Sequence, residues 1–322
     1  MATEPSRTLS ETGRETGRET GREEESSKAW HAFIAGNVGG IFGLTVAFPF
    51  DTLKMRAMVE PEAYPSMGVS LRKMIGEEGV LSLYRGLLAP VVGYGAINAV
   101  AFGSYEWGKE VLRGEGGDPE ADPMWSVVVP AAGFAGLVQS FIRSPVELAK
   151  SVQQSWRNAD NPRAAPFRSS FHSIAHVVST EGVSGLFRGL SATIAREVPQ
   201  YAIYYPSYAI VRPALESAAP DSLRPVAVAS AGAVAGVAQW IPTISVDVIK
   251  SRMQGAPPGT YSSFVGCARA LWAEGGLPIF FKGTAPALVR AVPLHAGVFL
   301  GYDTTMRVLE RASAATDEST TE

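Results

Sequence analysis

The hexapeptide Pro49-Phe-Asp51-Thr-Leu-Lys54 recurs in altered form as Pro145-Val-Glu147-Leu-Ala-Lys150 and as Ser245-Val-Asp247-Val-Ile-Lys250. The copies are spaced by roughly one hundred residues, and self-similarity at a fixed period indicates a repeat architecture. Each copy keeps an acidic residue three positions before a lysine. The third copy has serine in place of proline, so the bend that proline would give its helix is in doubt there.

A second element follows each hexapeptide, after a loop and an amphipathic stretch. It has an acidic residue and a glycine, then an aromatic residue, a basic residue and a second glycine. Its three copies are Glu78-Gly…Tyr-Arg-Gly86, Glu181-Gly…Phe-Arg-Gly189 and Glu274-Gly…Phe-Lys-Gly283. An apolar span then begins, so each repeat is predicted to be a span, a short surface helix and a second span.

The distribution of charge predicts a membrane protein. Only 18% of the residues are charged and 46% are hydrophobic, against about 25% charged residues in average soluble proteins. A bilayer crossing takes about 20 residues, and six spans of about that length are available. A soluble all-α protein is the alternative, but a water-soluble core does not easily house six such helices. Ala32–Pro49, Gly86–Tyr105, Met124–Ile142 and Pro225–Val246 lack charge entirely, whereas Gly189–Val211 and Gly283–Tyr302 contain Arg196, Glu197 and Arg290.

Composition excludes several other classes. The net charge of −3 argues against a nucleic-acid-binding protein, which would carry a basic excess. The single cysteine and four scattered histidines leave no disulfide framework and no multi-cysteine metal cluster. We find no catalytic nucleophile, metal site or phosphate loop, so we expect neither an enzyme nor a cofactor.

The repeats resemble the mitochondrial carrier family (solute carrier family 25), over roughly Trp30 to Arg311. The resemblance implies an all-α membrane protein with six transmembrane helices in three pseudo-threefold repeats, each with a short matrix surface helix. Basic residues concentrate in three segments, Lys54–Arg85, Arg143–Arg188 and Lys250–Lys282. This places those segments on the matrix side and both termini in the intermembrane space. We expect repeats at residues 29–114, 123–216 and 224–311, disordered tails at 1–28 and 312–322, and a multi-pass protein of the mitochondrial inner membrane.

The hexapeptides predict a matrix gate. An acid and a base three residues apart lie on one helix face, so around a threefold axis each acid can reach the lysine of the next repeat. Such a ring would close the pore toward the matrix, although static salt bridges at helix ends remain the alternative. Two glutamines resemble the family's braces beneath the ring, and Met58 takes that place in the first repeat. The expected pairs are Asp51–Lys150, Glu147–Lys250 and Asp247–Lys54, with braces at Gln154 and Gln254.

A cytoplasmic gate is predicted at the other end of the even-numbered spans, where family members carry an aromatic residue, an acid and a base. The second repeat has Ala209 in place of the acid, and the third has Met306 in place of the base. Two pairs would survive, Glu106–Arg212 and Asp303–Lys109. Fewer pairs should lower the barrier to opening on this side.

The resemblance places substrate contacts near the middle of the even spans, at Gly93, Tyr94, Arg196, Glu197 and Arg290. Arginine can bind a carboxylate through two parallel hydrogen bonds. Glu197 suits an ammonium group, and Tyr94 offers an aromatic face for a cation. A structural Arg–Glu pair is the alternative reading.

The Arg-Glu pair and the third-repeat arginine resemble the carnitine/acylcarnitine and basic amino-acid branch. Basic amino-acid carriers tend to have a further acid deeper in the second span, where Ile97 and Asn98 stand here. We therefore expect carnitine/acylcarnitine exchange first, ornithine, lysine or arginine transport second, and a non-transporting scaffold third. The expected partners are a small zwitterionic solute and membrane lipids, with cardiolipin at the matrix side; we expect a monomer and no nucleic-acid partner.

Overall fold

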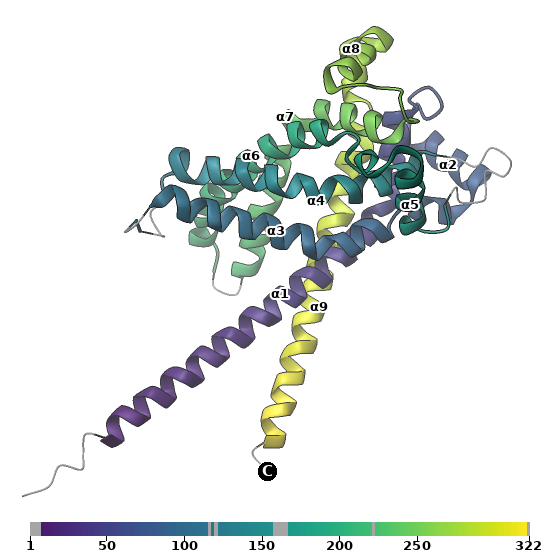
Figure 1. Ribbon diagram of the computed structural model, residues 1–322. Helices are drawn as coiled ribbons and strands as arrows, with labels where there is room; N and C mark the ends of the chain where they lie inside the picture. The colour runs from purple at the N-terminus through teal and green to yellow at the C-terminus, as the bar shows by residue number, and fades with distance from the viewer. Residues whose placement is uncertain (1–7, 115–116, 119–121, 157–166, 221–222, 321–322) are drawn as a thin grey trace, which may run out of the picture. The chain divides into compact units, whose positions relative to one another are not determined.

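The computed structural model describes residues 8–114, 117–118, 122–156, 167–220 and 223–320 (Figure 1). Over these residues the secondary structure is helical, with no strand. A long helix, a short helix and a second long helix follow one another three times, as the sequence predicts. The long helices are α1 (Thr8–Val59), α3 (Leu88–Arg113), α4 (Val129–Ser155), α6 (Leu190–Ala218), α7 (Arg224–Gly255) and α9 (Thr284–Thr320).

Each short helix is followed by one turn of 3₁₀-helix, and α4 is preceded by a single π turn. A serine begins each short helix by accepting a hydrogen bond from a backbone N–H three residues later, which satisfies one of the donors left free at a helix start. The short helices are α2 (Met67–Glu78), α5 (Ser170–Glu181) and α8 (Phe264–Gly275).

Five segments of the described chain are long and apolar enough to cross a membrane, namely Trp30–Val59, Val80–Arg113, Met124–Ser155, Val226–Gly255 and Leu277–Ser313. The sixth expected span is α6, which has 29 residues and so exceeds the length that a crossing needs. It is not among the five apolar segments, and it contains Arg196 and Glu197. The polar residues of α6 are therefore costly in a bilayer unless other helices pair them.

The chain forms two compact units, one from Thr45–His295 and one from Met1–Leu44 with Ala296–Glu322. In the second of these, Gly39 of α1 lies against α9, where an added Cβ would come within 2.7 Å of the Val298 carbonyl oxygen. In the unit formed by residues 45–295, α4 packs against α3, α6 and α7. This unit contains all the hexapeptides and is the one that positions the site.

The short helices pack their apolar faces against the ends of α1, α4 and α7. Met74, Val177 and Leu271 are buried apolar residues of α2, α5 and α8, and each is at most 1% exposed. Each lies in an apolar cluster that includes residues of the hexapeptide in the same repeat, such as Leu53, Leu148 and Val248. The three repeats therefore use one packing scheme, which agrees with the sequence periodicity.

The last glycine of each acid-Gly element permits close contact with the next repeat. Gly86 has φ +87°, and an added Cβ would lie 2.9 Å from the Lys150 carbonyl oxygen. The equivalent Cβ at Gly189 would lie 2.9 Å from Gln254, and that at Gly283 would lie 2.8 Å from Met58. Each repeat thus rests on the following one, and the third rests on the first.

The expected disorder of the two tails is not what the structure shows. Helix α1 extends back to Thr8, and α9 continues to Thr320. Residues 1–7, 321 and 322 lie outside the described residues. The Glu11-Thr-Gly-Arg14 repeat spaces acid and base three residues apart, which favours helix once the adjoining span provides the costly first turn.

Cys267, the one cysteine in the chain, should be unreactive in the folded protein. It is fully buried on α8, its Sγ donates to the Ile249 carbonyl oxygen, and burial raises the pKa of its thiol to about 11. The thiolate fraction at pH 8 is then roughly one in a thousand. We expect maleimide labelling only as the protein melts, whereas Ala270→Cys, at an exposed position of the same helix, should label at once. Rapid labelling of native Cys267 would contradict this packing.

Candidate functional site

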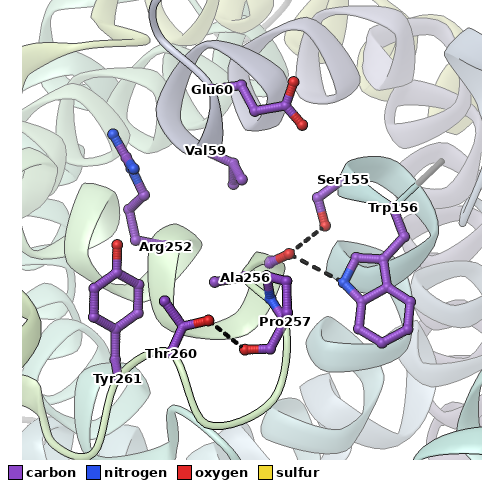
Figure 2. Close-up of a pocket in the computed structure, with 10 residues that line it drawn as sticks. Val59, Glu60, Ser155, Trp156, Arg252, Ala256, Pro257, Thr260 and Tyr261 are labelled. Carbon is purple, nitrogen blue, oxygen red and sulfur yellow. Dashed lines mark hydrogen bonds between the residues drawn. The ribbon is translucent and has the colours of Figure 1, made fainter.

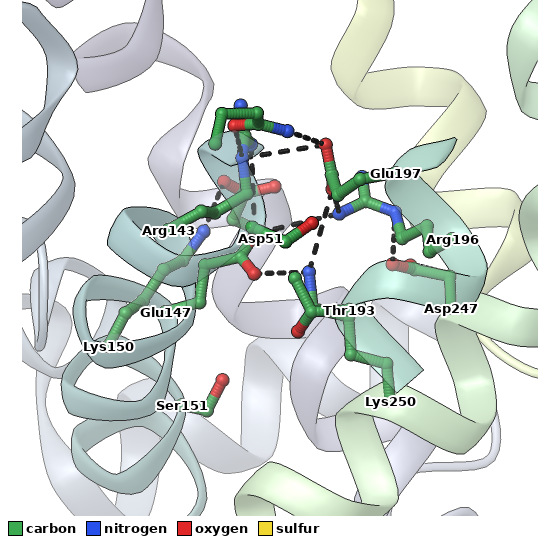
Figure 3. A network of polar contacts seen from close by, with 12 residues as sticks. Asp51, Arg143, Glu147, Lys150, Ser151, Thr193, Arg196, Glu197, Asp247 and Lys250 are labelled. Atoms are coloured by element: carbon green, nitrogen blue, oxygen red, sulfur yellow. Dashed lines mark hydrogen bonds and ion pairs between the residues drawn. The ribbon is translucent and has the colours of Figure 1, made fainter. Parts of the chain in front are cut away.

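The three expected ion pairs are present and join α1, α4 and α7 in a ring. Two of them, Asp51–Lys150 and Glu147–Lys250, can be followed in Figure 3. Lys150 Nζ lies 2.8 Å from Asp51 Oδ2. Lys250 pairs with Glu147, and Lys54 pairs with Asp247. We call these six side chains the ion-pair ring. Each pair joins one repeat to the next, so the ring exists only when all three repeats assemble around one axis.

Arginines from the even-numbered helices also bind the ring carboxylates. Arg290 Nη1 of α9 lies 3.1 Å from Asp51 Oδ1. Arg196 of α6 places Nε 3.0 Å from Asp247 Oδ1 and Nη1 3.5 Å from Glu147 Oε1. The two arginines predicted to contact a substrate are therefore engaged with the ring, and each ring carboxylate is shared by at least two cations.

Glu197 is held at the centre of the same network. Its carboxylate accepts a hydrogen bond of 2.6 Å from Gln139 Nε2 and one of 2.8 Å from Arg196 Nη1. Gly136 of α4 permits this approach, because a Cβ there would come within 2.7 Å of the Glu197 carbonyl oxygen. The side chain is only 1% exposed. Such a carboxylate stays ionised at low cost only if cations and donors surround it.

Arg143 of α4 is also a member of this network. Its Nε donates to Gln139 Oε1 at 2.8 Å and lies 3.5 Å from Glu197 Oε2, while Nη1 lies 3.8 Å from Glu147 Oε1. A signal for it was present, because Gln139, Arg143 and Glu147 are spaced four residues apart on one helix face.

The other two predicted contact residues lie elsewhere. Gly93 of α3 faces α4, and an added Cβ would lie 3.0 Å from Val146 Cγ2, so this position serves helix packing. Tyr94 is half-buried, and among the described residues it makes no hydrogen bond or ion pair with the charged network. The structure therefore brings together Arg196, Glu197 and Arg290, the last through Asp51, but not Gly93 and Tyr94.

The expected glutamine braces form hydrogen bonds to hydroxyl groups instead of to the ion pairs. Gln154 Nε2 donates to Thr52 Oγ1 at 2.9 Å. Gln254 Oε1 accepts from Ser151, and its Nε2 donates to Thr193, each at 3.4 Å. Both glutamines are 1% exposed and join neighbouring repeats directly beyond the ring. They support the same junctions as the ion pairs without contacting the charges.

A further set of contacts is found beyond the ring, where basic side chains bind carbonyl oxygens of the following repeat. Arg56 donates to the Ser155 carbonyl at 3.1 Å, Arg188 to the Gln254 carbonyl at 3.3 Å, and Arg252 to the Met58 carbonyl at 2.6 Å. Cations are favourable at helix C-termini because of the helix dipole. The acids of the acid-Gly elements orient these arginines, through the pairs Arg56–Glu78, Arg188–Glu181 and Arg252–Glu274.

A cavity of about 510 Å³ lies where α1, α4 and α7 end (Figure 2). Val59, Ser155 and Gly255 each follow a ring lysine by five residues, and all three line it. The Gly255 carbonyl accepts hydrogen bonds from Ser155 Oγ and Trp156 Nε1. The cavity therefore lies beyond the ring along the same three helices.

Charged side chains of the predicted cytoplasmic gate bind partners on their own helices. Lys109 contacts Glu106 on its own helix at 2.9 Å, and it lies 3.7 Å from Asp122. The Arg113 hydrogen bond holds the pKa of Asp122 below its usual range. Arg212 binds Glu216, so the pair Glu106–Arg212 is absent from the described structure. Asp303 pairs with Arg307 on its own helix.

Comparison with known proteins agrees with this arrangement. The profile of a family described as mitochondrial carrier protein matches residues 25–116, 122–218 and 221–313. The chain is a member of the mitochondrial carrier protein family. Its three family repeats are the same three repeats that the ion-pair ring joins. Because the members of this family are transporters, the carrier is a transmembrane transporter.

Several relatives are similar along most of their length. A mitochondrial basic amino acids transporter of Bos taurus is 35% identical over 83% of this carrier and 88% of the relative. Solute carrier family 25 member 47 of Homo sapiens is 32% identical over 86% and 97%. The mitochondrial arginine transporter BAC2 of Arabidopsis thaliana is 30% identical over 88% and 93%.

Removing one ring carboxylate should destabilise the carrier. Asp51→Asn leaves Lys150 and Arg290 without their shared counter-ion, and breaking a buried ion pair on one side costs about 3–5 kcal/mol. We expect the Tm of the detergent-purified carrier to fall by several degrees. Glu110→Gln, a matched change at an exposed position of α3, should leave Tm nearly unchanged. Equal Tm values for Asp51→Asn and the unmodified carrier would contradict a ring that stabilises this state.

Proposed function

We propose that this carrier moves basic amino acids across the mitochondrial inner membrane by alternating access. The sequence alone favours carnitine as the substrate. However, two of the similar proteins whose names state a substrate are transporters of basic amino acids and of arginine. The single structural observation that carries the proposal is Glu197, a nearly inaccessible carboxylate among cations about two turns into α6. It can receive the cationic group of a substrate once its present partners give way.

Arg290 would bind the carboxylate of the amino acid. Only Asp51 makes an ion pair with it among the described residues, and its Nε is buried without a hydrogen-bond partner. An unsatisfied buried donor costs free energy until an acceptor arrives. A substrate carboxylate can satisfy that donor and can accept two parallel hydrogen bonds from the guanidinium.

Substrate binding would weaken the ring through the arginines. A substrate carboxylate at Arg290 draws that side chain from Asp51, and a cationic group at Glu197 competes with Arg196. Arg196 also contacts Asp247 and Glu147, so its displacement removes a cation from two ring carboxylates. A ligand shifts a conformational equilibrium only by its differential affinity for the two states, and these exchanged contacts supply that difference.

The ring would close the carrier toward the matrix, with both termini toward the intermembrane space. Its three pairs are formed, while Glu106 and Arg212 near the other end are engaged with side chains of their own helices. This agrees with a state in which the opposite end is open. The carrier would act as a monomer among membrane lipids, with cardiolipin at the matrix side, because the repeats of one chain complete the ring.

Uptake into proteoliposomes tests the substrate. We expect vesicles preloaded with arginine to take up labelled arginine, lysine and ornithine faster than carnitine, since Glu197 and Arg290 match a cation and a carboxylate. Uptake of carnitine without arginine would restore the carnitine reading, which Ile97, in the place of a second acid, favours. Absence of uptake with every zwitterion and cation would favour a non-transporting scaffold.

The two proposed substrate contacts should be indispensable for that uptake. Arg290→Ala removes the carboxylate partner and Glu197→Ala removes the cation partner, so we expect uptake of arginine to fall at least about a hundredfold in each, the scale of a lost charged contact. Tm measured beside uptake separates this from misfolding. Retention of substantial uptake by both variants would contradict the proposed site, and Glu110→Gln serves as the control.

A further inference from the structure

Arg143 lies outside both the ion-pair ring and the predicted substrate contacts, yet it is bonded into the centre of the network (Figure 3). It stands two residues before the proline of the second hexapeptide, on α4. Gln139, which is fully buried, accepts its Nε–H and at the same time donates to Glu197. The guanidinium is therefore positioned by Gln139 to face the carboxylate of Glu197.

The charges of this network do not balance. Six basic side chains meet four carboxylates among the described residues, and within the low dielectric of a membrane protein an excess of cations is costly. The carboxylates are Asp51, Glu147, Glu197 and Asp247, and the basic side chains are Lys54, Arg143, Lys150, Arg196, Lys250 and Arg290. Arg143 is the basic residue that belongs neither to the ring nor to an expected contact position.

The Glu197 carboxylate leaves little room for a further cation. Oε1 bonds Arg196 at 2.8 Å and lies 3.9 Å from Lys250 Nζ, while Oε2 bonds Gln139 at 2.6 Å and faces Arg143 at 3.5 Å. Arg143 is the charged partner of Oε2, and its Nη1 also lies 3.8 Å from Glu147 Oε1. It can move toward Glu147 when another cation approaches Glu197.

We propose that Arg143 is a specificity-determining residue that occupies the cation subsite at Glu197 as an internal competitor of the substrate. The inference rests on the proposed transport of basic amino acids and assigns a role within that site. The guanidinium of Arg143 fills the subsite until the cationic group of a substrate displaces it toward Glu147. The apparent affinity for the substrate is then reduced in proportion to the fraction of carriers in which the subsite is free of Arg143.

This arrangement selects among cations by chemistry. A guanidinium or primary ammonium group of a substrate can donate hydrogen bonds to Glu197 and so replace what Arg143 provides. A quaternary ammonium group carries charge but has no N–H donor, so its arrival would leave the buried carboxylate without those bonds. Arg143 therefore favours basic amino acids over carnitine-like solutes, even though Glu197 alone would accept both.

The test compares Arg143→Gln with Arg143→Lys in proteoliposomes. Arg143→Gln removes the competing charge, so we expect KM for arginine to fall about five- to tenfold and inhibition by carnitine to strengthen. Arg143→Lys keeps a cation there and should retain a KM near that of the unmodified carrier. Arg269→Gln, which removes a positive charge from an exposed position on α8, controls for the change in net charge.

The outcomes separate this inference from the proposed function. If the unmodified carrier takes up arginine and Arg143→Gln has an equal or higher KM, the inference is wrong and the function stands. If the unmodified carrier takes up no basic amino acid, both are wrong. Should Arg143→Gln fail to reconstitute, Gln139→Leu frees Arg143 from its positioning partner and must lower KM in the same direction, by a smaller factor; an unchanged KM would again overturn the inference.

Discussion

The structure depends on the pairing of charges inside a membrane-spanning helix bundle. Uncompensated charges there are expensive, and in this carrier they are satisfied only between repeats. Lys150, Lys250 and Lys54 each bind an acid of another repeat. The glutamines, the carbonyl-binding arginines and the close-packed glycines follow the same cyclic order. The ion pairs therefore stabilise one arrangement of the three repeats, and no single repeat can satisfy its own charges.

The network is shared more widely than a ring of three pairs requires. Asp51 and Asp247 each bind a lysine and an arginine, and Glu147 lies near three basic side chains. Because each carboxylate has more than one cation, no side chain can leave without altering its neighbours. A substrate that brings both a carboxylate and a cation can replace contacts of both signs, which connects binding at α6 and α9 to the state of the ring.

The two ends of the bundle differ for a physical reason. The ring side has proline or serine, acid and lysine in every repeat, whereas the opposite end has lost one acid at Ala209 and one base at Met306. Side chains at that end find partners on their own helices, such as Arg212 with Glu216. Exposed pairs of this kind contribute little to stability. The free-energy difference between a carrier closed at the matrix end and one closed at the cytoplasmic end should therefore come mainly from the ring.

The repeats, the helices and the three ring pairs could be predicted from the sequence, because a fixed period and a three-residue spacing bring an acid and a lysine of neighbouring repeats within reach of each other. It also placed Arg196, Glu197 and Arg290 together. It did not find Gln139 or the contacts of Arg143, and it did not place Gly93 against Val146. These contacts come from the tertiary structure, because they depend on how closely α4 approaches α3 and α6, and no local pattern along the chain sets that distance.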